Sequence, residues 1–156
     1  MTQIKKLVFI SYQRTNSLLA LAIFQALSAN NYDVFIDYNT IDLGKFDDAI
    51  LNQIKGREYF IIILTPGAMT QGRDSYEDRF RYEIEIAIKH KRIIIPVMLA
   101  GYGWGKIEKY FTSKFDVLGH LNSLSITLSS FGEAMNQLQT QFLTHNNPIA
   151  LQPISQ

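Results

Sequence analysis

The chain has no cysteine, and its other potential metal ligands are sparse. Without cysteine it can form neither a disulfide framework nor a thiolate nucleophile. The three histidines, His90, His120 and His145, do not have the spacing of a zinc site. We therefore expect no metal centre.

An excess of charge and a long apolar run are also missing from the 156 residues. The 15 basic and 14 acidic residues nearly cancel and form no basic stripe, so we do not expect nucleic-acid binding. The longest apolar runs, such as Tyr59–Leu64 and Ile93–Leu99, are too short to span a bilayer. The opening residues lack the pattern of a signal peptide. One soluble, cytoplasmic domain without membrane contact is the expectation.

Several nucleotide-binding and catalytic signatures are absent as well. No G-x-G-x-x-G follows the first apolar run, and no G-x-x-x-x-G-K-[ST] occurs anywhere. There is no G-x-S-x-G nucleophile elbow. A phosphorylated receiver domain would need paired acids after the first strand, where the chain reads Ile10-Ser11-Tyr12. These absences argue against a dinucleotide-binding Rossmann domain, a P-loop enzyme, a receiver and a serine hydrolase.

Short apolar segments alternate along the chain with amphipathic ones. The apolar segments are typical of buried parallel strands: Leu7–Ile10, Asp33–Ile36, Tyr59–Leu64, Ile93–Leu99 and a weaker one near Leu124–Leu128. Helices are predicted from Asn16 or Ser17 to Asn30, over Phe46–Gly56, around Glu83, and near Phe131–Leu143. This alternation predicts an α/β fold with helices on both faces of a parallel sheet.

Ligands of such sheets bind outside the carboxyl ends of the strands. The loops at those ends therefore form the candidate site: Ser11–Asn16, Asp37–Lys45, Thr65–Glu77 and Ala100–Gly105.

The segment Asp74–Leu99 is typical of one helix that feeds one buried strand. Its apolar side chains form one stripe on a helical wheel, which we expect to face the core: Phe80, Ile84, Ala87 and Ile88. Glu83 lies at the edge of this stripe. A carboxylate there is half out of water, where desolvation and neighbouring groups can tune its ionisation. The alternative is an ordinary boundary glutamate.

Several short motifs follow one another between Lys6 and Trp104. They are Val8–Tyr12, Asp33–Asp37, Leu43–Phe46, Leu64–Ala68, Arg79–Ile84 and Ile94–Val97. In this order and spacing they resemble a TIR (Toll/interleukin-1 receptor) domain, most of all the TIR domains that cleave NAD+ in bacterial anti-phage proteins and in the axon-degeneration NADase. The resemblance implies a flavodoxin-like three-layer fold with a central five-stranded parallel sheet. We expect the domain to occupy residues 1–143. Residues 144–156 contain two prolines and little apolar periodicity, which is typical of a tail or the start of a linker.

The resemblance also implies roles for individual positions. The family's catalytic glutamate falls on Glu83, and the basic residue after the first strand falls on Arg14, which would bind phosphate. Substrate contacts are further implied at or beside the family's binding positions: Ser11, Tyr12, Lys45, Phe46, Arg79 and Trp104. Two positions depart from the family, because a tryptophan often stands where Arg79 is and a basic residue often stands where Gln13 is.

The activity implied is that of an NAD+ glycohydrolase or cyclase, which gives nicotinamide and ADP-ribose or a cyclic isomer. NAD+ is then the substrate, and no resident cofactor is expected. The resemblance further implies activation by self-association through TIR–TIR contacts, in bacterial defence. A sensor domain could follow Thr144–Gln156. The alternative function is a non-enzymatic interaction module that associates through Asp37–Lys45 and the neighbouring helices.

Each implied role has an alternative in the residue's own chemistry. Arg14 could be a solvated loop arginine, and Phe46 could be a core residue that opens its helix. Trp104 could cover the end of the sheet. Ser11 and Tyr12 could support their loop by hydrogen bonds.

Overall fold

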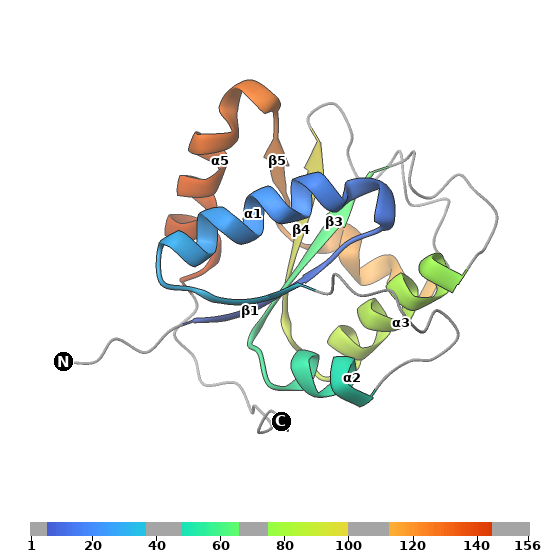
Figure 1. Ribbon diagram of the computed structural model, residues 1–156. Coiled ribbons are helices and arrows are strands. Elements are labelled where there is room, and N and C mark those ends of the chain that lie inside the picture. Colours follow the sequence, from blue (N-terminus) through green and yellow to red (C-terminus); the bar gives the residue numbers. More distant parts are fainter. Residues whose placement is uncertain (1–5, 37–47, 66–74, 100–112, 145–156) are drawn as a thin grey trace.

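Five parallel strands form the centre of the protein, in the order β2-β1-β3-β4-β5 (Figure 1). The computed structural model describes residues 6–36, 48–65, 75–99 and 113–144. The strands are β1 (Leu7–Ser11), β2 (Asp33–Ile36), β3 (Tyr59–Leu64), β4 (Ile93–Leu99) and β5 (Leu124–Ile126). This strand order is that of flavodoxin-like sheets, and it confirms the predicted α/β fold.

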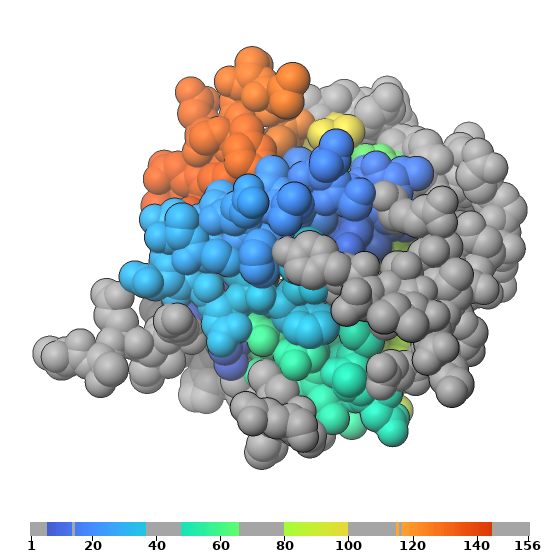
Figure 2. Space-filling model, viewed as in Figure 1, coloured from blue at the N-terminus to red at the C-terminus, as the bar shows by residue number. Residues whose placement is uncertain are grey.

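Helices cover the sheet on both faces. The α-helices are α1 (Ser17–Ala29), α2 (Asp48–Lys55), α3 (Ser75–Lys89) and α5 (Phe131–Gln137). Shorter turns are the 3₁₀ segments η1 (Arg14–Asn16), η4 (Ser113–His120) and η5 (Leu128–Ser130), and the π-helical turn η6 (Leu138–Phe142). Figure 1 shows α1 and α5 together on one face, with α2 and α3 on the other. In the space-filling view, α1 and α5 lie directly against each other (Figure 2).

The predicted elements are confirmed in kind, but the end of β5 and the start of α3 need correction. β5 ends at Ile126, because Leu128 already belongs to η5 and is fully exposed. α3 begins at Ser75, so residues 75–77 are helical although we expected a loop up to Glu77. η4 was not predicted at all. The loops 37–47, 66–74 and 100–112 lie outside the described residues.

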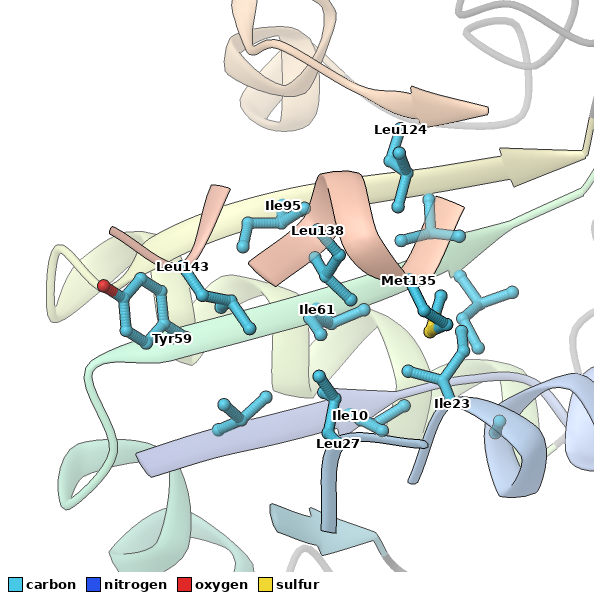
Figure 3. Close-up of a cluster of buried hydrophobic side chains, with 14 of the residues drawn as sticks. Ile10, Ile23, Leu27, Tyr59, Ile61, Ile95, Leu124, Met135, Leu138 and Leu143 are labelled. Atoms are coloured by element: carbon cyan, nitrogen blue, oxygen red, sulfur yellow. The ribbon is translucent and has the colours of Figure 1, made fainter. Parts of the chain in front are cut away.

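Alternation along the strands divides the buried side chains into two cores. On β3, Tyr59, Ile61 and Ile63 join the core beneath α1 and α5. Figure 3 draws side chains of this core as sticks, with Tyr59 and Ile61 labelled. Phe60, Ile62 and Leu64 join the core beneath α2, α3 and η4. Because successive side chains point to opposite faces, each strand position belongs to one helical layer only. All six residues of β3 are buried, as its unbroken apolar run predicts.

Three phenylalanines lie side by side across the face that α2 and α3 cover. Phe9 stacks on Phe35 of β2 and on Phe60 of β3, with ring centroids 5.3 Å apart in both pairs. The strand register places each pair directly opposite. Stacked aromatic pairs contribute about 0.5–1.5 kcal/mol beyond the area that they bury. This row of stacked rings therefore helps to hold β1, β2 and β3 in register.

Two buried arginines, Arg57 and Arg92, form hydrogen bonds at the amino-terminal end of the sheet. Arg57 donates from Nη1 to the backbone oxygen of Asp33 at 2.6 Å and to its carboxylate at 3.0 Å. Arg92 donates to the backbone oxygen of His90 at 2.8 Å and to that of Lys55 at 3.3 Å. These carbonyls end helices or lie where β2 begins, so the guanidinium groups satisfy backbone acceptors that packing removes from water.

Two helices end on residues in the left-handed region, Asn31 after α1 (φ 68°) and Lys91 after α3 (φ 56°). After α3, the N–H of Arg92 donates to the oxygen of Ala87 at 3.0 Å, and that of Lys91 donates to the oxygen of Ile88 at 3.1 Å. This is the Schellman arrangement, which favours glycine at the left-handed position.

No helix in the described part of the chain is both long enough and apolar enough to cross a membrane.

Replacing Lys91 with glycine should stabilise the protein by about 1 kcal/mol, because glycine removes the steric penalty of a left-handed Cβ. Lys91→Ala retains that Cβ and serves as the matched control for loss of the charge. Urea denaturation measures the free energy of unfolding of both variants. An equal change in the two would show that the backbone conformation is not the cause.

Candidate active site

Buried polar side chains gather at the carboxyl end of the sheet. Of the six described polar or charged residues that are buried, four lie at this end and only Arg57 and Arg92 lie at the other. The four are Ser11, Gln13, Thr65 and Glu83. They surround the ends of β1 and β3, between which the strand order reverses direction. Such a switch point is where open α/β sheets bind their ligands.

Ser11 is the last residue of β1, and the sheet fixes its direction. It pairs with Ile62 of β3, so its backbone belongs to the ladder. Phe9, two residues earlier, faces the α2–α3 core. Side chains two apart share a face, so the Ser11 hydroxyl points towards α3.

Glu83 meets this hydroxyl from the middle of α3. The Ser11 Oγ donates a hydrogen bond to Glu83 Oε1 at 2.7 Å, across 72 residues of sequence. Phe80 and Ile84 anchor the same stretch of helix in the core. Only 6% of Glu83 is exposed, which is deeper than the half-exposed position that the helical wheel predicts. Glu83 does lie beside the apolar stripe of α3, as predicted, but its side chain faces the end of β1 and not open water.

A carboxylate in this setting has a defined orientation and little water around it. The 2.7 Å separation is usual for a hydroxyl donor and also lies within the range of a charge-assisted bond to an ionised acid. Electrostatic interactions of such a group with a bound cation are stronger than in bulk water. The arrangement is therefore suited to stabilising positive charge that develops on a ligand at the strand ends.

A second polar pair links the neighbouring strand end to the first loop. Thr65 directly follows β3 and is 8% exposed. Its Oγ1 accepts a hydrogen bond of 3.1 Å from Nδ2 of Asn16, the residue that precedes α1. Asn16 or Ser17 was expected to cap α1; Asn16 occupies the cap position, but its side chain makes no capping hydrogen bond. It joins the turn after β1 to the end of β3 instead.

The other candidate residues are placed unevenly. Arg14 lies in η1 and Arg79 in α3, so their backbones flank the site, while nothing further is described of their side chains. Tyr12 is half-buried and packs against the α1–α5 core, on the face opposite Glu83. Lys45, Phe46 and Trp104 lie outside the described residues. Their contacts with substrate stay predictions.

Sequence reasoning missed Thr65 and Asn16 as a pair and did not anticipate that Gln13 is buried. The alternation along β3 offers a signal for Thr65. Leu64 faces the α2–α3 core, so the next side chain must face the α1 layer, where Asn16 lies.

Metal ligands do not cluster in the described segments: no group of three or more histidine, aspartate or glutamate side chains there could hold an ion.

Comparisons with known proteins point to one family. A family model described as "TIR domain" matches residues 8–138, a span that contains all five strands except the first residue of β1. The NAD(+) hydrolase tir-1 of Caenorhabditis elegans is 39% identical over 93 residues, which are 58% of this chain and 10% of that protein. The NAD(+) hydrolase sarm1 of Drosophila melanogaster is 33% identical over 105 residues, 65% of this chain and 8% of that protein.

A third relative, the NAD(+) hydrolase SARM1 of Danio rerio, is 32% identical over 93 residues, 58% of this chain and 13% of that protein. This chain thus corresponds to about a tenth of the length of these curated relatives. Among solved structures, the flavodoxin-like domain of a Synechococcus sp. protein superposes with a TM-score of 0.51 at 14% identity, over 83% of this chain and 91% of that one. That likeness concerns the fold alone.

Thr65→Val retains the shape of the side chain and removes the acceptor of the Asn16 amide. We expect it to lower the free energy of unfolding by about 1 kcal/mol, because the amide is left partly buried without that acceptor. Thr140→Val is the matched control, since the Thr140 hydroxyl is exposed and only bonds its own helix at the oxygen of Asn136. Urea denaturation of both variants measures the difference. A Thr140→Val effect as large as that of Thr65→Val would contradict the role given to this pair.

Proposed function

This chain belongs to the TIR domain family, and on that premise we propose that it cleaves the bond between nicotinamide and ribose in NAD+. The proposal depends most on one observation, the buried Glu83 carboxylate held at the switch point of the sheet. The relatives that bear the name NAD(+) hydrolase support it at the level of the family.

The chemistry of NAD+ suits a site with a single acid. The nicotinamide ring nitrogen is already cationic, so the base departs as a neutral molecule and no group has to protonate it. Ordinary glycosidases need a second carboxyl group for that step. Glu83 would stabilise the oxocarbenium-like ribose that forms as the bond breaks, or orient the ribose hydroxyls.

The step balances with water as the only co-reactant. The electron pair of the carbon–nitrogen bond leaves with nicotinamide and neutralises its ring. Water adds to the ribose carbon, and its proton passes to solvent, which gives ADP-ribose. Attack by a nitrogen of the substrate's own adenine would instead give a cyclic isomer. Both products require the same first bond to break.

The remaining contacts are proposed on the family's pattern. Arg14 would bind phosphate through charge-assisted hydrogen bonds. Phe46 and Trp104 would stack on the rings or exclude water from them. Lys45 and Arg79 are proposed as further substrate contacts, although Arg79 stands where the family often has a tryptophan.

We further propose that self-association activates the domain, in bacterial defence and under the control of a sensor domain beyond residues 144–156. The non-enzymatic TIR–TIR module is the outcome that remains if no NAD+ cleavage is found. Assembly would then persist without any requirement for Glu83.

Glu83→Gln should reduce nicotinamide release by at least about 100-fold, since the neutral amide cannot stabilise a developing positive charge. The amide oxygen can still accept the Ser11 hydrogen bond, so the melting temperature should change little. Glu85→Gln, on the same helix and only partly buried, is the matched control and should retain activity.

Chromatography of NAD+ reaction products measures both variants, with dilute and with crowded protein. Full activity in Glu83→Gln would exclude the assigned role. Wild-type protein that assembles but leaves NAD+ intact under all these conditions would overturn the enzymatic proposal.

A further inference from the structure

We propose that Ser11 is a positioning residue for Glu83, and that it acts on the reaction through this carboxylate without touching the substrate. The inference rests on the function proposed above. It goes beyond the expectation that Ser11 contacts substrate or supports its own loop, because it assigns the hydroxyl to one acceptor on another element.

Both partners have fixed backbones, so the hydrogen bond joins two rigid supports. Ser11 is held in the sheet ladder opposite Ile62. Glu83 is held by the packing of Phe80 and Ile84 into the α2–α3 core, where both are at most 2% exposed. A bond between such supports selects one rotamer of the glutamate. Catalytic groups must stay within about 0.5 Å and 10–20° of their productive geometry, which a loosely held carboxylate does not achieve.

The chemistry of the hydroxyl agrees with this role. Ser11 has a single proton to donate, and it points at Oε1 of Glu83 at 2.7 Å. Donation to a carboxylate favours the ionised form, which is the form that stabilises an oxocarbenium-like ribose. One hydrogen bond thereby restrains the direction of the carboxylate.

Burial separates this role from substrate binding. Ser11 is 1% exposed, and its hydroxyl proton is engaged within the protein. With its one proton committed to Glu83, the Ser11 hydroxyl has none left to donate to a ligand at the strand ends. Removal of the hydroxyl should therefore alter the rate of bond cleavage and leave the affinity for NAD+ unchanged.

Ser11→Ala tests the proposal, with Ser125→Ala as the matched control. Ser125 lies in β5 of the same sheet, but its side chain is exposed. We expect Ser11→Ala to lower kcat by about 10- to 100-fold, the loss seen when a group that orients a metal ligand is removed, with KM changed less than twofold. Ser125→Ala should match the wild type. Circular dichroism and the melting temperature report whether each variant is folded, and kcat is expressed per folded molecule.

Ser11→Cys supplies a graded control, because a thiol is somewhat larger than a hydroxyl and is a weaker donor. Its kcat should lie between those of wild type and Ser11→Ala. On a Glu83→Gln background, Ser11→Ala should cause little further loss of residual activity, because two residues that act as a unit are not additive. Calorimetric titration of NAD+ into the Glu83→Gln and the doubly substituted protein should give the same affinity.

The outcomes separate the inference from the proposed function. A raised KM or a weakened NAD+ affinity with unchanged kcat would make Ser11 a substrate contact and overturn the inference. A lowered melting temperature with unchanged kcat per folded molecule would make its role purely structural, with the same consequence. In both cases NAD+ cleavage by the wild type would stand. A wild type that never cleaves NAD+ would overturn the proposed function and the inference with it.

Discussion

The alternation of side chains along parallel strands that are covered on both faces governs this molecule. Each residue of β1 and β3 must face either the α1–α5 layer or the α2–α3 layer, and the apolar residues fill both. The same alternation continues at the strand ends, where the side chains become polar. It directs Ser11 towards Glu83 on α3 and Thr65 towards Asn16 at the start of α1. The core and the site therefore follow one geometric rule.

The buried polar side chains at the two ends of the sheet bind different kinds of partner. At the amino end, Arg57 and Arg92 donate mainly to backbone carbonyls, so their hydrogen-bonding capacity serves the fold. At the carboxyl end, Ser11 and Glu83 bond to each other through side chains. Backbone acceptors are a structural necessity wherever helices and strands end inside a protein. A side-chain pair has no such necessity, because two apolar residues could occupy the same space.

Local patterns predicted most of the fold. The strand β3 and the end of α1 near Asn30 could be predicted because neighbouring residues along the chain carry the signal. The helical wheel likewise isolated Glu83 as the acid beside the apolar stripe. It did not predict how deeply Glu83 is buried, since burial depends on what faces the helix. The residue that faces Glu83 is Ser11, which lies 72 residues away in the sequence.

The limits of the elements were harder to predict than their existence. Leu128 looks like the end of a strand by hydrophobicity, yet it is fully exposed, because η5 begins there and turns the chain towards α5. The start of α3 at Ser75 follows no apolar signal, since its first turn is wholly polar or aromatic. Pairs such as Thr65 and Asn16 become visible only once the strand order is known, because the order decides which loops meet.

The burial of Glu83 has opposite consequences for stability and for chemistry. Removing a carboxylate from water is unfavourable, and replacing buried polar groups with well-packed apolar ones is often neutral or stabilising. The described residues of the α2–α3 core beside it, such as Phe80 and Ile84, are apolar. A developing positive charge on a ligand would gain from a carboxylate in this place, because the absence of water that penalises the free carboxylate also strengthens its attraction to that charge. The Ser11 hydroxyl reduces the penalty and keeps the attraction aimed in one direction, which is why the pair is more readily explained by a reaction than by packing.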